Sequence, residues 1–167
     1  KVFEVRTQLK EMFCAKSEQN IIFTQNCTQS LNMVSGGLLK ENDHVIITCL
    51  EHNSVIRPVH RLSLTKGVAY DIAQIVPNDE DKTVENIERL IKPNTKLIVT
   101  THASNVCGIV LPIEKIARMA KRYGLYYMVD AAQTAGMLPI HLEETPIDFV
   151  AMPGHKGLYG PSGTGVL

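Results

Sequence analysis

The segment GHKGLYGPSGTG near the end of the chain places a primary amine, Lys156, between a histidine and a run of glycines. A deprotonated lysine amine can attack an aldehyde carbon, and glycines allow the backbone around it to fold tightly. The segment lacks the GxxxxGK[ST] order of a phosphate-binding loop and the GxGxxG order of a dinucleotide site. Taken alone, it is also compatible with a surface loop that carries a solvated lysine.

A carboxylate and an amide follow one another in the segment VDAAQTAG. Asp130 ends a predicted strand and Gln133 comes shortly after it, so both side chains could reach one face of a planar ligand. Aspartate is also a frequent cap and turn residue, and a carboxylate can bind magnesium. From these residues alone, the three interpretations stay open.

Two histidines, His52 and His155, lie in predicted loops after strands, whereas His44 opens a strand and His60 lies within a helix. An imidazole can exchange protons near neutral pH, although a lone histidine is more often structural. The spacing supplies no convergent set of ligands, so we expect no metal site.

The polar segment QNCTQS precedes a predicted helix. Its backbone N–H groups and the hydroxyls of Thr28 and Ser30 could bind an anion, because a helix N-terminus carries positive partial charge. The alternative is an ordinary helix cap that binds nothing.

Alternating apolar strands and amphipathic helices must position these side chains. Strands are predicted at residues 20–24, 44–49, 68–76, 96–102 and 125–131, and the last residues, TGVL, begin another. Helices are predicted at residues 2–13, 31–39, 55–64, 83–91 and 112–124. We expect Thr83 to cap its helix, and Pro58 to bend its helix or to confine it to an early turn.

This alternation favours a single α/β domain with a mainly parallel, doubly wound sheet that helices cover on both faces. In such sheets the ligand crevice lies outside the carboxyl ends of the strands. The site is therefore expected in the loops that follow strands, which are residues 24–30, 50–54, 101–108, 130–136 and 152–165.

The composition argues against a nucleic-acid-binding or membrane protein. Seventeen Lys and Arg residues balance 17 Asp and Glu residues among 167, so no global field favours nucleic acid or an anionic membrane. No apolar run is long enough to span a membrane, and the first residues lack the apolar core of a signal peptide, so we expect a soluble cytoplasmic protein. The cysteines form no CxxC pair, which indicates reduced thiols; they are Cys14, Cys27, Cys49 and Cys107.

Considered together, five segments resemble those of the class V aminotransferase family, most closely its cysteine desulfurase and selenocysteine lyase branch. In chain order they are FTQNCTQSLNMV, EHNSV, THASNVCG, VDAAQTAG and GHKGLYGPSGTG. Each segment is weakly specific by itself, but five in the family's order are specific. The resemblance implies the large domain of a fold type I enzyme that uses pyridoxal 5'-phosphate (PLP).

The resemblance also implies roles for the side chains that meet the PLP ring. Lys156 would form the Schiff base with the cofactor, and Asp130 would pair with the protonated pyridine nitrogen. Gln133 would hydrogen-bond the phenolic oxygen. His52 would stack on the ring and shuttle protons.

The remaining roles concern the phosphate and the substrate. By the same resemblance, Thr28, the N–H groups after Cys27 and the side chain of His155 would bind the cofactor phosphate. Asn105 would hold the substrate carboxylate or the ring oxygen.

The implied reaction cleaves the C–S or C–Se bond of an amino acid, most simply L-cysteine or L-selenocysteine. The freed Lys156 amine would take the Cα proton, and a mobile cysteine thiolate would attack sulfur, which leaves alanine and an enzyme persulfide. The resemblance further implies a homodimer and allows for a sulfur-acceptor protein.

Some features depart from the family pattern. Pro153 stands where the family commonly has a serine, and one more residue than usual separates Lys156 from Tyr159. Family members are much longer, and an N-terminal segment and a smaller C-terminal domain supply their substrate-binding arginine and catalytic cysteine. We therefore expect residues 1–167 to be an incomplete PLP-binding large domain with little turnover alone. Neither Cys107 nor Cys27 matches the family's sulfur acceptor, and we expect Cys27 to be a small turn residue.

Other functions stay open. A class V aminotransferase or another PLP lyase would use the same residues, although His52 favours the desulfurase branch because many aminotransferases place a larger aromatic residue there. A non-catalytic α/β binding or assembly module is the alternative from a different class.

Overall fold

Seven strands form one sheet in the computed structural model, which describes residues 1–167. The strands are β1 (Phe23–Thr24), β2 (His44–Thr48), β3 (Ala69–Ala73), β4 (Thr95–Thr101), β5 (Tyr126–Asp130), β6 (Phe149–Pro153) and β7 (Gly165–Val166). Their order across the sheet is β1-β7-β6-β5-β4-β2-β3. Strands β2 to β6 run parallel, whereas β7 pairs antiparallel with β6 and with β1. The expected mainly parallel, doubly wound α/β fold is confirmed.

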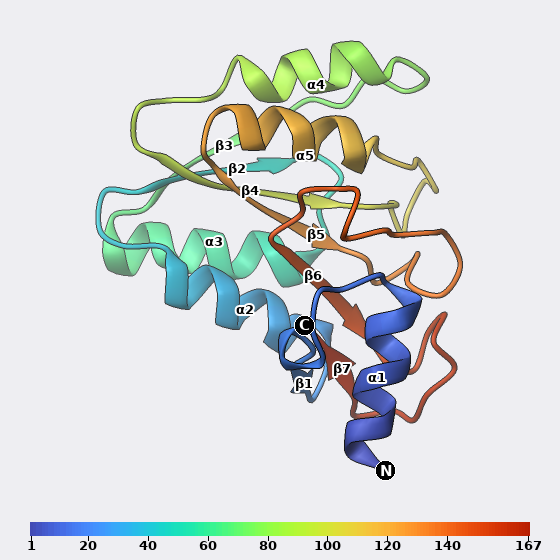
Figure 1. The fold of residues 1–167 in the computed structure, drawn as a ribbon. Helices are drawn as coiled ribbons and strands as arrows, with labels where there is room; N and C mark the ends of the chain where they lie inside the picture. Colours follow the sequence, from blue (N-terminus) through green and yellow to red (C-terminus); the bar gives the residue numbers. More distant parts are fainter.

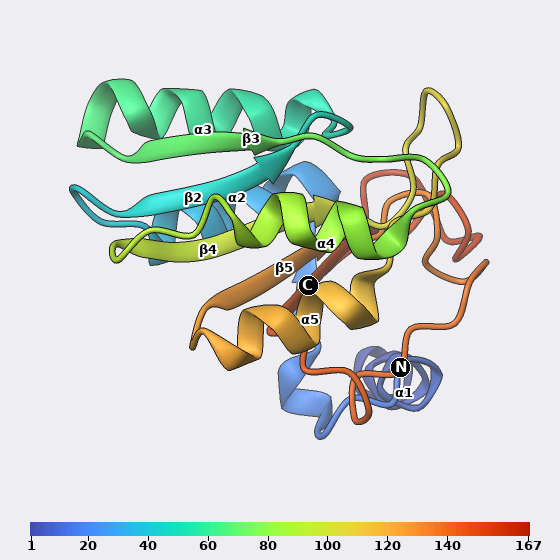
Figure 2. The same cartoon turned by 90° about the horizontal axis from the view of Figure 1, so that it is seen from above.

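Helices cover both faces of this sheet (Figure 1). They are α1 (Val2–Met12), α2 (Cys27–Leu38), α3 (Asn53–Lys66), α4 (Glu80–Glu88) and α5 (Ile113–Arg122), with a short 3-10 turn at Glu18–Asn20. Helices α2 and α3 lie on one face, and α4 and α5 lie on the other (Figure 1). The turned view in Figure 2 shows α4 drawn over the sheet and aligned with β4, with α3 beside β3.

Strand β2 shows why the apolar runs are continuous rather than alternating. All five of its residues are buried. Val45 and Ile47 pack into the core beneath α2 and α3, whereas Ile46 packs into the core beneath α4 and α5. A strand covered on both faces is apolar on both, so its central residues lack the period of two that marks a half-exposed strand.

Two local predictions are wrong. The predicted strand 20–24 shortens to the two residues of β1, because this segment lies at the edge of the sheet, where Phe23 is exposed. The cap of α4 is Asp79, whose side chain accepts a hydrogen bond from the Lys82 N–H. Thr83 instead lies inside that helix, buried, with its hydroxyl bonded to the backbone of Val76.

Two other elements extend beyond their predicted bounds. Helix α2 begins at Cys27, within the segment expected to be a loop. Helix α3 runs from Asn53 to Lys66 with Pro58 inside it, so the proline does not confine the helix to a first turn. Strand β6 was not named from the sequence, and the structure places it directly before the lysine loop.

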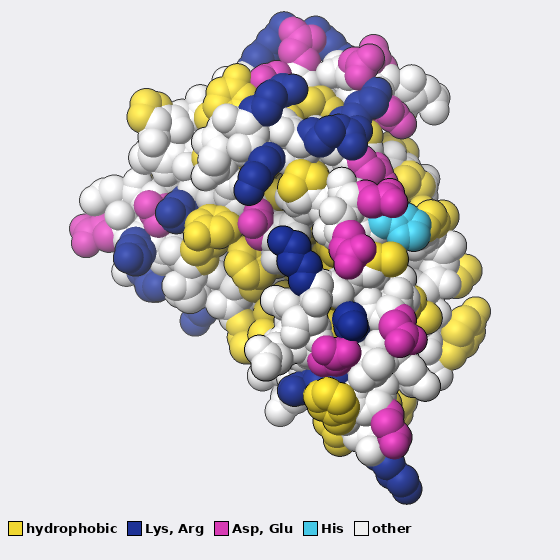
Figure 3. Space-filling view, in the orientation of Figure 1, with side chains coloured by type: hydrophobic (Ala, Val, Ile, Leu, Met, Phe, Trp, Pro, Cys, Tyr) yellow, Lys and Arg dark blue, Asp and Glu magenta, His cyan; other side chains and the backbone are white.

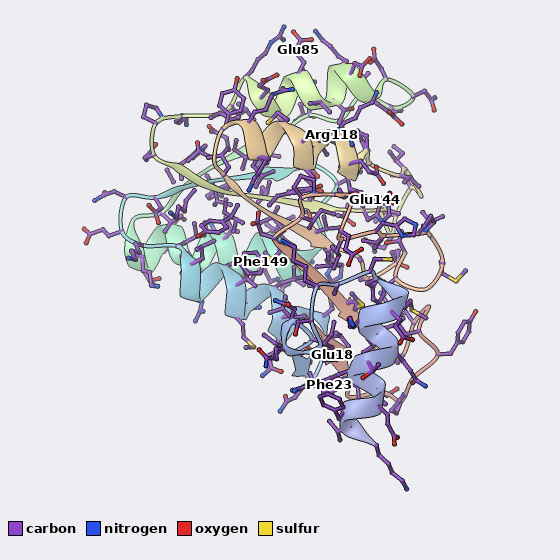
Figure 4. All side chains as sticks on the ribbon, in the orientation of Figure 1. Glu18, Phe23, Glu85, Arg118, Glu144 and Phe149 are labelled. Atoms are coloured by element: carbon purple, nitrogen blue, oxygen red, sulfur yellow. The ribbon has the colours of Figure 1, made fainter.

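The surface over α4 and α5 carries acidic and basic side chains in alternation (Figure 3). Ion pairs join Lys115 to Glu80 and Asp81, and Glu85 points outward from α4 between its partners Lys82 and Arg89 (Figure 4). Exposed pairs of this kind contribute little to stability but keep the face polar. No helix is long and apolar enough to cross a membrane.

Candidate active site

A pocket of about 170 Å³ opens at the carboxyl ends of the parallel strands. It is lined by Asn26, Cys27, Thr28, His52, Ser54, Thr101, Ala103, Asn105, Asp130, Ala132, Gln133, Pro153, His155 and Lys156. Every one of these residues lies in the five loops that the sequence predicted for the site. The eight residues predicted for the site are all among them, so the fold brings together side chains from five separate segments.

Asp130, at the end of β5, forms the floor of this pocket and is 2% exposed. Its Oδ1 accepts hydrogen bonds from the Ala132 N–H at 2.9 Å and from the Cys27 thiol at 3.4 Å. Burial raises the pKa of Asp130, and these two hydrogen bonds, together with the neighbouring His52 and Lys156 side chains, oppose that rise. Because both internal donors use Oδ1, Oδ2 is left to accept a hydrogen bond from a ligand.

Cys27 is not the turn residue that we expected. It is the first residue of α2, it is buried, and its thiol points to Asp130. Burial and then the Asp130 charge raise the pKa of this thiol far above its ordinary value. The group is therefore an S–H donor to the carboxylate rather than a thiolate nucleophile.

The beginning of α2 faces the pocket with free backbone donors. The Asn26 side chain caps the helix by accepting from the Gln29 N–H at 2.8 Å, and the N–H groups of Cys27 and Thr28 have no partner within the chain. These donors and the exposed Thr28 hydroxyl suit an anion. The hydroxyl of Ser30 does not join them, because it is buried against Thr24 and β7.

His52 caps helix α3, and this contact determines which ring nitrogen carries the proton. Its Nδ1 accepts from the Ser54 backbone N–H at 3.1 Å and lies 2.8 Å from the Ser54 hydroxyl. A backbone N–H can only donate, so Nδ1 is unprotonated and the neutral ring carries its proton on Nε2. The cap thus orients the imidazole and leaves Nε2–H as a donor.

The lysine loop packs against the loop that follows β5 through two glycines. A Cβ on Gly157 would lie 2.3 Å from the carbonyl oxygen of Ala135, and one on Gly136, which has φ of +80°, would lie 2.4 Å from the Gly157 carbonyl oxygen. This close approach holds Lys156 on the same side of the sheet as Asp130. The Lys156 and His155 side chains themselves are exposed at the rim.

Comparison with known proteins shows which family the chain belongs to. The family model described as Aminotransferase class-V matches residues 1–167. The chain belongs to the class-V aminotransferase family. This family uses PLP, so the side chains that line the pocket are candidate PLP ligands.

Relatives in this family agree in sequence and in fold. The chain is 38% identical over 170 residues to a probable cysteine desulfurase from Methanothermobacter thermautotrophicus. This alignment covers all of this chain and 41% of that relative. It superposes on the apo cysteine desulfurase from Thermococcus onnurineus NA1 with a TM-score of 0.84 and 32% identity, covering 98% of this chain and 41% of that one.

A further similar structure is that of the cystine C-S lyase C-DES in complex with its reaction product cysteine persulfide. It matches with a TM-score of 0.91 and 28% identity over 99% of this chain and 45% of that one. The chain thus spans less than half the length of the relatives it matches.

The donor set of the pocket fits PLP. A phosphate requires several N–H and O–H donors, which the beginning of α2 supplies. A protonated pyridine nitrogen requires a buried carboxylate with a free oxygen, which Asp130 supplies. An aldehyde requires an accessible amine, which Lys156 supplies.

Several residues around the pocket were missed by the sequence analysis. Ser54 and Thr101 line it, and Glu51 lies buried directly beneath the turn that carries His52. The N-cap of α3 is His52, and histidine is not among the residues usual at that position, so no ordinary cap signal pointed to Ser54. Cys107, in contrast, lies outside the pocket, exposed in a separate hollow, with its thiol pKa lowered by a hydrogen bond to Ser104.

Proposed function

We propose that this chain forms the PLP-binding domain of an enzyme that cleaves the C–S or C–Se bond of an amino acid, with L-cysteine or L-selenocysteine as substrate. The observation that carries the proposal is that one pocket joins the Lys156 amine, the Asp130 carboxylate and the His52 imidazole. The similarity to cysteine desulfurases supports it.

Each polar group of PLP has a candidate partner in this pocket. Thr28, the free N–H groups at the beginning of α2 and His155 would hold the phosphate. Asp130 Oδ2 would accept from the pyridine nitrogen, and the Gln133 amide would donate to the phenolic oxygen. Pro153, which can offer neither a hydroxyl nor an N–H, leaves the phosphate more dependent on α2.

The side chains of the pocket then have separate tasks in the reaction. Bound PLP supplies an electron sink for the pair released at the Cα carbon of an amino acid. Lys156 Nζ would hold the Cα proton, and Asn105 would orient the substrate carboxylate. The His52 ring would limit movement of the cofactor, and its Nε2–H would offer a proton above the ring.

Two related activities use the same pocket. The C-DES structure is that of a cystine C-S lyase, which favours a lyase as the alternative within the family. A class-V aminotransferase would instead transfer the amino group to a 2-oxo acid. We also propose that the enzyme works as a homodimer and passes sulfur to an acceptor protein, which light scattering and sulfur-transfer assays test.

The first experiment asks whether the pocket binds PLP. The purified chain is incubated with PLP and reduced with borohydride, and the modified residue is identified by mass spectrometry. We expect one adduct, at Lys156, which is lost in Lys156→Ala and retained in Lys40→Ala. Lys40 is exposed and precedes β2, so it lies at the amino ends of the strands, away from the pocket. Modification spread over many lysines would reject the site and favour a non-catalytic binding module.

The second experiment identifies the reaction. The PLP-loaded protein is offered L-cysteine, L-selenocysteine and L-cystine, and alanine, pyruvate and sulfide are measured. Alanine from cysteine or selenocysteine supports the desulfurase, and pyruvate from cystine supports a C–S lyase. Amino transfer to a 2-oxo acid without release of sulfur or selenium would contradict both.

A further inference from the structure

Glu51 is a buried carboxyl group that the proposed chemistry does not use. It lies between β2 and α3, immediately before His52, and it is 7% exposed. Its Oε1 accepts from the Thr48 hydroxyl at 2.6 Å and from the Thr101 backbone N–H at 2.9 Å. Its Oε2 is buried and has no hydrogen-bond partner.

The two hydrogen bonds of Glu51 connect β2 and β4 at the floor of the pocket, next to β5. Thr48 ends β2 and Thr101 ends β4, so Glu51 crosses from one strand to the next. Thr101 is in turn paired with Asp130 on β5. Glu51 therefore ties the turn that carries His52 to the strand beside Asp130.

The charge state of Glu51 follows from its surroundings. A buried carboxylate with one oxygen unpartnered is costly, and a second carboxylate, Asp130, lies close enough to repel it. Burial, with a smaller contribution from the Asp130 charge, raises the pKa of Glu51 to about 8, although the hydrogen bonds from Thr48 and Thr101 oppose the rise. The other titratable groups around it are Tyr127 on β5 and the adjacent His52.

We propose that Glu51 is a positioning residue of this pocket, which as a neutral carboxylic acid fastens the His52 turn to the end of β4 and leaves Asp130 as the one buried carboxylate charge. The proton lies on Oε2, because Oε1 is occupied by two donors. Charge on Glu51 would raise the pKa of Asp130, which would favour the protonated acid over the carboxylate that pairs with a cationic ring nitrogen. This role rests on the proposed PLP site.

The proton is tested without cofactor. Infrared spectra of the purified chain at pH 7 are compared with those of Glu51→Gln. The Asp130→Asn variant identifies any band that comes from Asp130 instead. We expect a protonated-carboxyl band that Glu51→Gln removes and that the exposed-site control Glu143→Gln retains. If Glu51→Gln removes no such band, Glu51 is ionised and the proposal is overturned.

The tie is tested by hydrogen exchange, also without cofactor. Glu51→Ala should speed exchange of the Thr101 N–H by about tenfold or more, whereas Glu51→Gln keeps an acceptor and should stay within about threefold. Unchanged exchange in Glu51→Ala would overturn the tie.

The affinity for PLP tests whether Glu51 supports the proposed cofactor site. Titration with PLP should show binding about tenfold weaker in Glu51→Ala and restored to within about threefold in Glu51→Gln. Equal binding by Glu51→Ala and the unmodified chain would reject the positioning role. If the unmodified chain binds no PLP, the proposed function fails, while the infrared and exchange results still decide the state of Glu51.

Discussion

The Cys27 thiol donates a hydrogen bond to Asp130 Oδ1 at 3.4 Å, although 103 residues separate the two in the chain. Because the Ala132 N–H binds the same oxygen, the carboxylate is held by one oxygen and offers the other to the pocket. The contact also assigns Cys27 a chemical state. A thiol that donates to a buried carboxylate stays protonated, so it supports the site without acting as a nucleophile.

This state predicts a strict order of thiol reactivity. Alkylation with iodoacetamide at pH 7.5 to about 8, followed by peptide mass spectrometry, should modify Cys107 readily and leave Cys27 unmodified in the folded chain. Cys107 is exposed and its thiol pKa is lowered, whereas Cys27 is buried and its thiol pKa is raised. Alkylation after denaturation serves as the control, because both thiols should then react. Rapid modification of folded Cys27 would contradict the assignment.

The contact between the two glycine loops predicts a steric effect. Gly157→Ala should destabilise the fold by about 1–3 kcal/mol, because the added Cβ meets the Ala135 carbonyl oxygen, and it should reduce PLP incorporation at Lys156. The matched control is Gly36→Ala, within α2, where a Cβ meets nothing and should stabilise by about 0.5–1 kcal/mol. Denaturant unfolding measures both. Equal stability of the two variants would show that the loops separate easily.

The cap at α3 predicts that two roles of His52 can be separated. His52→Ala removes the acceptor for the Ser54 N–H and should lower the free energy of unfolding by about 1 kcal/mol. His52→Asn supplies another capping side chain and should restore most of that stability without restoring the ring. Nitrogen NMR of the unmodified chain should place the proton on Nε2. A protonated Nδ1 in the neutral ring would refute the cap geometry.

The raised pKa of Glu51 predicts a pH-dependent difference in stability. The folded chain keeps this proton up to a pKa of about 8, whereas the unfolded chain releases it near the ordinary value for glutamate. Stability from this group is therefore present at low pH and is lost as pH rises toward 8. The melting temperature of Glu51→Gln relative to the unmodified chain should rise over that range. A constant difference from pH 5 to about 8 would contradict the raised pKa.

The sequence by itself determined the class of fold and the loops that form the pocket. Short, mostly apolar runs such as HVIIT are typical of strands covered on both faces, and their alternation with amphipathic helices favours a mainly parallel sheet. Because parallel strands all end at one edge, the polar residues that follow them must meet there. This rule needs no knowledge of strand order, and it placed Asp130 in the pocket. The strand before Lys156, β6, was not predicted, so Lys156 was assigned to the same pocket through the family resemblance.

The tertiary structure alone decided which side chains touch. Strand β4 lies between β2 and β5, and this order brings Glu51 against Thr101 and next to Asp130. Likewise, the position of α2 turns Cys27 toward Asp130 and Ser30 away from the pocket. Helical and strand periods describe which face of one element is apolar, but they carry no information about its neighbours. Contacts between distant segments depend on strand order and helix packing, which only the folded chain defines.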